Sequence, residues 1–386
     1  MAKWRRRTSA VGIATGVAAA AVGAVIAAEK IAVGRSRLGP DPAADEPFGQ
    51  LRGRPVEVIA DDGVVLHAEI SGRDDAPVTV VFCHGYCLSQ DVWHYQRLAL
   101  AEEARLVLYD QRGHGRSGRG DSDRASIDQL GTDLAAVLAA TAPGDGQVVL
   151  VGHSMGGMTI MALADQRPEL FGSKVAGVVL ISTASHHVSA THWLPPAMRP
   201  AARYAAPALL RGAADGWRAA LTERIRAAGG DLAFLSTRFI GFGSPTASPA
   251  VVDFLERVIR STPIGVVADF YIALLEHDKR AALGTLGRVP VIVITGEQDR
   301  LISAAKAVAL AAEIPGTRLV RAPGAGHAII LECPEAVTSE IAGLVKEVRD
   351  SARPADTRRA RRAGRRRHRG ADAASRPAAR QPAAGG

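Results

Sequence analysis

Cysteine is scarce in this sequence of 386 residues, which contains only Cys83, Cys87 and Cys333. An odd number of cysteines without a repeated spacing excludes a disulfide-stapled scaffold and a zinc site built on cysteine pairs. Because Cys83 ends an apolar run, we expect it to be a small buried hydrophobic side chain rather than a disulfide partner of Cys87. The sequence predicts neither a bound metal nor a cofactor.

A net positive charge is absent from the centre of the chain, although the net charge of the whole sequence is +8. Residues 352–386 contain 11 arginines and two aspartates, which give +9, and residues 1–37 contribute +6. The residues between them therefore carry −7. A folded body with this charge has no electrostatic reason to bind polyanions, so nucleic acid is not expected as its partner.

The first 37 residues are a basic, Ala-rich leader or a membrane anchor. Four basic residues among the first seven precede residues 9–28, an uncharged stretch of 20 residues with 9 alanines, 3 glycines and neither leucine nor phenylalanine. The length favours a transmembrane anchor, whereas a cleaved signal peptide and a soluble leader remain alternatives. We expect membrane association through this segment, or export, with the orientation left open by the basic residues on both sides.

The C-terminal residues 351–386 are predicted to be a disordered, Arg-rich tail. They contain the run RRARRAGRRRHRG and few apolar residues, and such a composition cannot form a packed core. Contact with anionic lipid or nucleic acid and a merely solvated tail remain equal alternatives. Residues 38–54, rich in proline, glycine and acidic residues, are predicted to be a linker.

Short apolar runs alternate with helical patterns through the rest of the chain. Residues 56–60 and 64–71 flank an Asp-Gly turn and predict an antiparallel hairpin. The later runs are nearly continuous in apolar residues, as in strands buried on both faces. They lie at residues 78–83, 105–109, 148–151, 175–182, 289–295 and 317–322. This order predicts an α/β fold with a doubly wound, mostly parallel sheet.

The helical pattern between residues 184 and 288, broken by prolines, divides the sheet-forming region. We expect a core domain formed by residues 55–183 and 289–350, with residues 184–288 as a helical cap over the strand ends. Ligands of open α/β sheets bind outside the carboxyl ends of the strands, which favours a role for the cap in substrate choice. The alternative is a group of packing helices without such a role.

The sequence VVLVGHSMGG at residues 148–157 places Ser154 between an apolar strand and a mostly apolar helix. It satisfies the nucleophile-elbow pattern G-x-S-x-G, in which glycines two residues before and after the serine allow a sharp, strained turn. The hydroxyl of Ser154 would then stand at the carboxyl edge of the sheet and at a helix N-terminus, where developing negative charge is favoured.

An acid and a base are predicted at the same edge of the sheet. Asp299 follows the strand at 289–295, and His327 follows the strand at 317–322 on a Gly-rich loop. A catalytic triad needs these groups beside the serine, His327 as base and Asp299 as its orienting acid. Asp269 and Asp278 are rival acids that follow no strand, whereas His84 and His153 are expected to be structural.

Two backbone N–H groups are expected to bind a tetrahedral intermediate. Met155 follows the nucleophile and supplies one, and Tyr86, in the loop after the strand at 78–83, supplies the other. The ring of Tyr86 would also be suited to line the substrate pocket.

Taken together, the motifs resemble those of the α/β-hydrolase family, in the family's order and spacing. They are HGY at 84–86, DQRGHGRS at 110–117, GHSMGG at 152–157, GEQD at 296–299 and GH at 326–327. The Ala/Leu-rich cap and the possible membrane anchor favour a small-molecule ester of a lipid or another apolar acyl compound as the substrate. The resemblance itself implies a serine hydrolase and a structural role for the DQRGHGRS loop and its Asp110, and it does not fix the substrate. It leaves open a cofactor-free, haloperoxidase-like perhydrolase or a ligand-binding protein of the same fold.

Overall fold

The computed structural model describes residue 34 and residues 41–142, 144–186, 199–227 and 230–352. Apart from residue 34 and from residues 351–352, which end α13, Pro334–Ala352, the predicted anchor and the predicted Arg-rich tail lie outside these ranges, so both stay predictions. No single helix in the described ranges has the length and apolar composition to cross a membrane. Among the described helices, only α8, Pro249–Ser261, and α9, Ile264–Glu276, reach that length and apolar composition when taken together, and a bend of 94° separates them.

Eight strands form one mixed sheet in the order β1-β2-β4-β3-β5-β6-β7-β8. β1 and β2 pair antiparallel, as the Asp-Gly turn predicts, and β2 pairs antiparallel with β4. All later pairs are parallel. The order confirms the predicted fold class. The strands are β1 Arg54–Ile59, β2 Val65–Gly72, β3 Val78–Cys83, β4 Arg105–Tyr109, β5 Gln147–His153, β6 Val175–Ile181, β7 Val291–Gly296 and β8 Arg318–Ala322.

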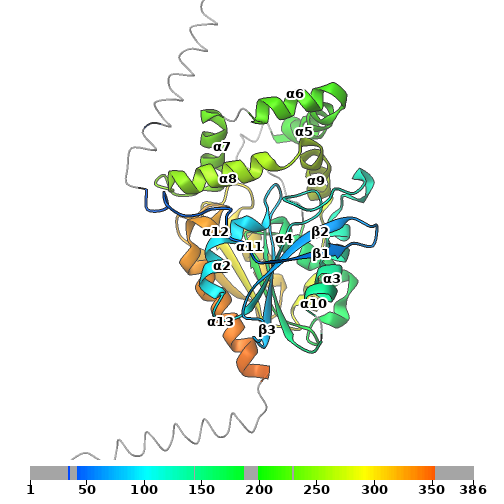
Figure 1. Cartoon of the computed structure of the whole chain (residues 1–386), viewed down its shortest axis with the longest axis vertical. Helices are drawn as coiled ribbons and strands as arrows, with labels where there is room; N and C mark the ends of the chain where they lie inside the picture. The colour runs from blue at the N-terminus through cyan, green and yellow to red at the C-terminus, as the bar shows by residue number, and fades with distance from the viewer. Residues whose placement is uncertain (1–33, 35–40, 143, 187–198, 228–229, 353–386) are drawn as a thin grey trace, which may run out of the picture.

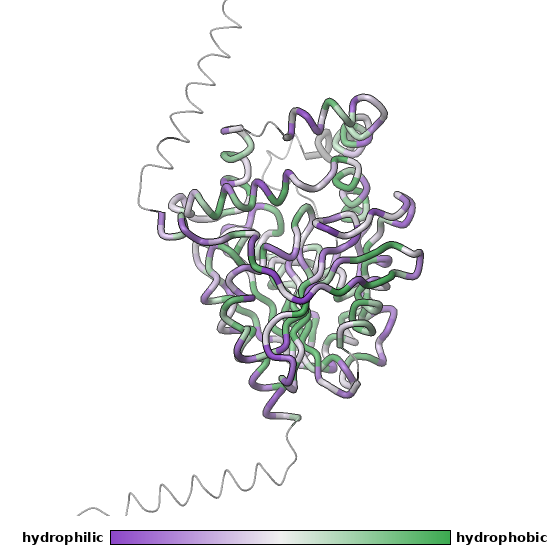
Figure 2. The backbone as a smooth tube through the Cα atoms, in the orientation of Figure 1, coloured by the Kyte–Doolittle hydropathy of each residue, from purple (hydrophilic) through white to green (hydrophobic). Residues whose placement is uncertain are grey.

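Helices cover both faces of the sheet (Figure 1). On one face Val149 and Val151 of β5 belong to a core shared with α13, and on the other face Val148 and Leu150 belong to a core shared with α3 and α4. Strands buried on both faces explain why their sequences are apolar without alternation. The tube in Figure 2 is accordingly hydrophobic along the strands inside the molecule. The covering helices are α2 His94–Leu100, α3 Ile127–Thr141, α4 Met155–Gln166, α10 Leu283–Leu286, α11 Ala304–Glu313, α12 Ile329–Glu332 and α13 Pro334–Ala352.

Between β6 and β7 the described chain forms five longer helices that gather at one end of the sheet, at the top of Figure 1. This end is the one at which the parallel strands finish, as shown by the cavity that the helices share with the loops after β3 and β5. The helical cap insertion of the predicted fold class is thus present. Its helices are α5 Arg199–Ala214, α6 Gly216–Ala227, α7 Asp231–Gly241, α8 Pro249–Ser261 and α9 Ile264–Glu276.

Two segments differ from the sequence-based expectation. The period of residues 90–104 predicts one helix, but the segment begins as a 3-10 turn, Gln90–Trp93, and the α-helix α2 that follows ends at Leu100. The carbonyl of Leu100 accepts from the N–H groups of Glu103 and Ala104 in a closing turn. The described part of the predicted linker is packed on the cap. Asp41 accepts hydrogen bonds from the start of α8, and Phe48 stacks on Phe254 of α8 at 4.8 Å.

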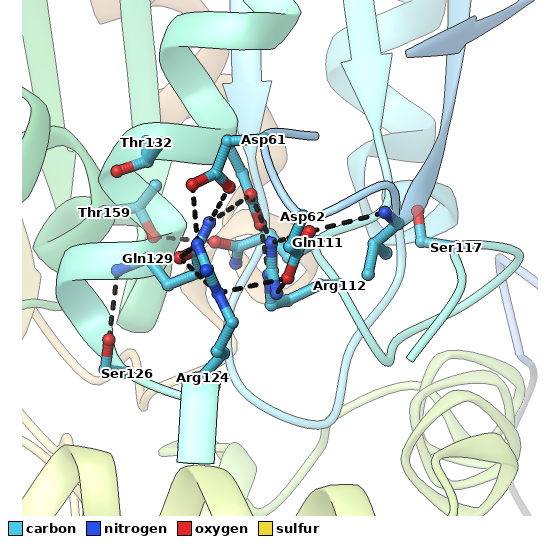
Figure 3. Close-up of polar contacts among 12 residues, drawn as sticks. Asp61, Asp62, Gln111, Arg112, Ser117, Arg124, Ser126, Gln129, Thr132 and Thr159 are labelled. Atoms are coloured by element: carbon cyan, nitrogen blue, oxygen red, sulfur yellow. Dashed lines mark hydrogen bonds and ion pairs between the residues drawn. The ribbon is translucent and has the colours of Figure 1, made fainter. Parts of the chain in front are cut away.

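A buried arginine joins the hairpin to the loop after β4 and to α3 (Figure 3). Arg112 donates from Nε and Nη2 to both carboxylate oxygens of Asp133, each at 2.6 Å, and from Nη1 to Asp62 at 2.7 Å. Nearby, Arg124 and Gln129 contact Asp61 in the hairpin turn. The structural role implied for the DQRGHGRS loop fits these contacts, because the loop is fixed from two sides.

Candidate active site

Ser154 stands on a sharp turn between β5 and α4. Its backbone has φ 54° and ψ −118°, a conformation that is costly for a residue with a side chain. The turn leaves no room at its flanking glycines, since a Cβ on Gly156 would clash with the carbonyl of Cys83 and one on Gly152 with the backbone of Gly156. The requirement for glycine two residues before and after the serine is therefore steric.

Asp299 is held as a carboxylate beside Nδ1 of His327. Oδ2 lies 2.8 Å from Nδ1 of His327, and Oδ1 accepts from the N–H groups of Leu301 and Ile302, both at 2.8 Å. Burial raises the pKa of Asp299, but the neighbouring imidazole and the two amides lower it more, and the resulting pKa lies below the ordinary value of 3.8. The ionised carboxylate of Asp299 accepts a hydrogen bond from the Nδ1–H of His327, which keeps the ring proton on Nδ1 and so fixes the ring tautomer.

His327 connects this acid to the serine. Its Nε2 lies 3.0 Å from Oγ of Ser154, and with the proton on Nδ1 the neutral ring accepts at Nε2 from the serine hydroxyl. The three side chains predicted from separate segments are thus in one continuous hydrogen-bonded chain. Their residues are between 6% and 9% exposed, so they face a sheltered site that still reaches solvent.

The rival acids lie elsewhere. Asp269 on α9 pairs with Arg119 at 2.6 Å, and Asp278 pairs with Arg280 in an exposed turn. His84, expected to be structural, accepts from the N–H of Gln111 at 2.9 Å through Nε2, and burial lowers its pKa to about 4.

The expected oxyanion donors lie beside the serine. Tyr86 borders the same cavity as Ser154, and a Cβ added to Gly85 would lie 3.2 Å from the Cβ of Ser154. Across the described part of the chain, the backbone hydrogen bonds leave the N–H groups of Tyr86 and Met155 without an acceptor. Both are therefore available to a ligand. The ring of Tyr86 also lines the cavity, and its hydroxyl donates to the carbonyl of Val267 on α9 at 2.5 Å.

A cavity of about 470 Å³ extends from Ser154 between the sheet and the cap. Its walls are mostly aliphatic, and the cap supplies much of them, including Ile240, Leu255, Ile259, Leu274 and Leu275. These lining residues were not identified from the sequence, since the helical period of the insertion shows an apolar face without showing what it covers. The hydrophobic stripe on 249–261 contains two of them, Leu255 and Ile259.

The three cysteines are free thiols, and Cys83 is fully buried, as expected. Among the residues that the structure describes, no group of histidine, cysteine, aspartate and glutamate side chains is arranged to hold a metal ion.

Comparison with known proteins agrees with this geometry. Residues 78–334 match the α/β hydrolase fold family. A pimeloyl-acyl-carrier-protein methyl ester esterase of Stenotrophomonas maltophilia is 30% identical over 72% of this chain and 97% of its own length. A bifunctional esterase/perhydrolase of Acinetobacter calcoaceticus is 28% identical over 75% of this chain and 99% of its own. The structure of a thermophilic esterase from Thermogutta terrifontis aligns with a TM-score of 0.60 and 25% identity, over 77% of this chain and all of that one. The chain belongs to the α/β hydrolase fold family.

Proposed function

We propose that the protein is a serine hydrolase that cleaves a carboxylic ester through an acyl-enzyme on Ser154. The observation that carries the proposal is the hydrogen-bonded chain from Ser154 through His327 to Asp299, with contacts of 3.0 and 2.8 Å. Esterases recur among the relatives compared above, which supports an ester as the substrate.

In this mechanism the oxygen of Ser154 attacks the ester carbonyl carbon while its proton moves to Nε2 of His327. The negative charge on the former carbonyl oxygen is stabilised by the N–H groups of Tyr86 and Met155. The tetrahedral intermediate then collapses, and His327 gives the proton to the departing alkoxide, which leaves as an alcohol. Water activated by the same imidazole attacks the acyl-enzyme and releases the carboxylic acid and free Ser154. Asp299 stabilises the imidazolium throughout.

The aliphatic cavity supports an apolar group on the substrate, because burying apolar surface there stabilises the complex by roughly 25 cal/mol per Å². A panel of p-nitrophenyl esters tests this part. We expect higher kcat/KM for medium acyl chains than for acetate, and a strong preference for acetate would contradict it.

A fluorophosphonate probe tests the serine mechanism directly. We expect the wild-type protein to be labelled on Ser154, the Ser154→Ala variant to resist labelling, and the exposed control Ser339→Ala to be labelled like the wild type. A folded wild-type protein that resists the probe would contradict the proposal and favour a ligand-binding role.

The bifunctional relative favours a second candidate, perhydrolysis at the same serine. In that reaction hydrogen peroxide replaces water as the nucleophile towards the acyl-enzyme and the product is a peracid. Peracid formation from an ester and hydrogen peroxide, lost in Ser154→Ala, would support it.

A further inference from the structure

The carboxylate of Glu332 lies between the cap and the loop that bears His327. Oε1 accepts from the N–H of Ser244 at 2.7 Å, and Oε2 accepts from the N–H of Gly326 at 2.7 Å. The N–H of Gly243 lies 3.1 Å from both oxygens. One side chain at the end of α12 therefore satisfies three backbone donors from two segments that are more than 80 residues apart.

The two segments also touch through their backbones. Residues 241–244, which we call the cap hinge, are the last residue of α7 and the first part of its connection to α8. The carbonyl of Gly241 accepts from the N–H of Ala328 at 2.7 Å. A Cβ on Gly243 would clash with the carbonyl of Gly324, and one on Gly326 with the backbone of the hinge. Glycine is needed on both sides for this approach, so the cap hinge and the His327 loop pack as one body.

The cap hinge reaches the substrate cavity and the His327 loop reaches the serine. Gly241 and its neighbour Ile240 line the cavity, as does His327. Any displacement of the hinge would consequently be passed to the imidazole through Glu332 and the paired backbones.

We propose that Glu332 is a positioning residue that couples the placement of the cap to the placement of His327. This inference rests on the proposed function, since it assigns Glu332 a task only if His327 is the base. Glu332 does not touch the reacting atoms. It acts through Gly326, the residue directly before the imidazole, and through the hinge that forms part of the cavity wall.

A carboxylate side chain suits this role because both of its oxygens accept hydrogen bonds here. A glutamine amide has nearly the same shape but accepts at one end and donates at the other. In Glu332→Gln the amide oxygen can accept a hydrogen bond from the N–H of Ser244 or from that of Gly326, but not from both. The amide N–H₂ must then face the other backbone N–H, which is also a donor. The substitution therefore breaks the bridge on one side while it preserves most of the packing.

The test compares Glu332→Gln with Glu335→Gln, which makes the same charge change at an exposed position on α13. Active-site titration with the fluorophosphonate probe counts functional sites, so that kcat is expressed per titrated site. We expect kcat per site to fall about 10- to 100-fold in Glu332→Gln, as for a small misplacement of a catalytic group. We also expect the ratio of kcat/KM for medium over short esters to change by several-fold, and Glu335→Gln to match the wild type in both.

A merely structural role gives a different result. If Glu332→Gln lowers Tm or the titrated fraction but leaves kcat per site and the chain-length ratio at wild-type values, the coupling is overturned. Labelling of wild-type Ser154 is a separate result, so failure of the serine mechanism is distinguishable from failure of this inference.

Hydrogen exchange of the wild-type protein provides a measurement that does not depend on a variant that folds. We expect phosphonylation of Ser154 to change the exchange of the cap hinge and of the His327 loop together. A change confined to the loop, with the hinge unaffected, would overturn the proposal.

Discussion

Nε2 of His153 lies 2.9 Å from the carbonyl oxygen of His327. The residue directly before Ser154 is therefore hydrogen-bonded to the backbone of the triad histidine. Burial lowers the pKa of His153 to about 3, which keeps its ring neutral at pH 7. A carbonyl only accepts, and the proton of His153 is therefore on Nε2. The histidine within GHSMG, expected to be structural, fixes the backbone of His327 against the nucleophile turn.

The acid of the triad can be tested with Asp299→Asn. The amides of Leu301 and Ile302 hold one oxygen of residue 299 in place, so the asparagine N–H₂ would face Nδ1 of His327 and favour the wrong ring tautomer. We expect kcat to fall by about 10⁴-fold while the protein stays folded. Esterase kinetics measure the loss, with Asp278→Asn as the control that should stay near wild-type activity. Equal effects of the two substitutions would contradict the assignment.

The glycines of the elbow can be compared with a glycine in open space. In Gly156→Ala the added methyl group would clash with the carbonyl of Cys83, and we expect loss of folded protein or of several kcal/mol of stability. Gly343 lies in α13 with no atom within 4 Å of an added Cβ, so Gly343→Ala should stabilise the protein by about 0.5–1 kcal/mol. Thermal and denaturant unfolding measure both effects, and a well-folded Gly156→Ala would contradict the steric account.

The buried arginine of the β4 loop should matter more than its exposed neighbour. Arg112→Ala would leave Asp133, whose side chain is fully buried, without its ion-pair partner, at a cost of about 3–5 kcal/mol. Arg124→Ala removes ion pairs with Asp61 and Asp62 from a side chain that is 40% exposed, and it leaves Asp62 paired with Arg112, so it should cost only about 1 kcal/mol. Urea unfolding of the two variants measures the difference. Similar losses would show that burial does not decide the strength of this network.

Acid should destabilise the fold through its buried histidines. Burial lowers the pKa of His84 and His277 to about 4, and that of His114 and His153 to about 3. Since the ordinary pKa of histidine is 6.5, these four imidazoles are protonated in the unfolded chain between pH 6.5 and 4 but stay neutral in the folded chain. Stability is therefore full above pH 6.5 and falls as pH decreases through this window, by about 1 kcal/mol per pH unit for each imidazole.

His277→Gln isolates one contribution to that slope. His277 donates through Nε2 to the carbonyl of Ala184 at 2.9 Å, and a glutamine amide can make the same hydrogen bond without titrating. Denaturant unfolding at pH 7, 6 and 5 should show a shallower loss of stability in this variant than in the wild type. An unchanged slope would mean that His277 binds a proton in the folded state.

The sheet and the polar residues at its edge could be predicted from the sequence because both have strong local signals. Fully buried parallel strands require apolar runs, and the run at 78–83 coincides with β3. Strand ends then locate their loops, which is why Ser154, Asp299 and His327 could be selected before their contacts were known. A polar residue in the loop that follows a buried strand lies at the edge of the sheet where that strand ends.

Contacts between segments that are far apart in the sequence could not be predicted from local sequence patterns. Glu332 follows a short apolar stretch and resembles any helix-terminal glutamate in sequence, since its three donors are backbone groups without a side-chain signature. Likewise, the packing of Phe48 on Phe254 depends on the position of α8, which local periodicity does not determine. Such pairings arise from the tertiary fold.

The helix α13 ends at Ala352 on the side of the molecule opposite the cap helices (Figure 1). A resin or sensor surface linked at that end would leave α5 to α9 turned towards the bulk solution. Immobilisation through the C-terminal side should thus preserve the turnover measured for the free protein, which suits flow assays of ester panels.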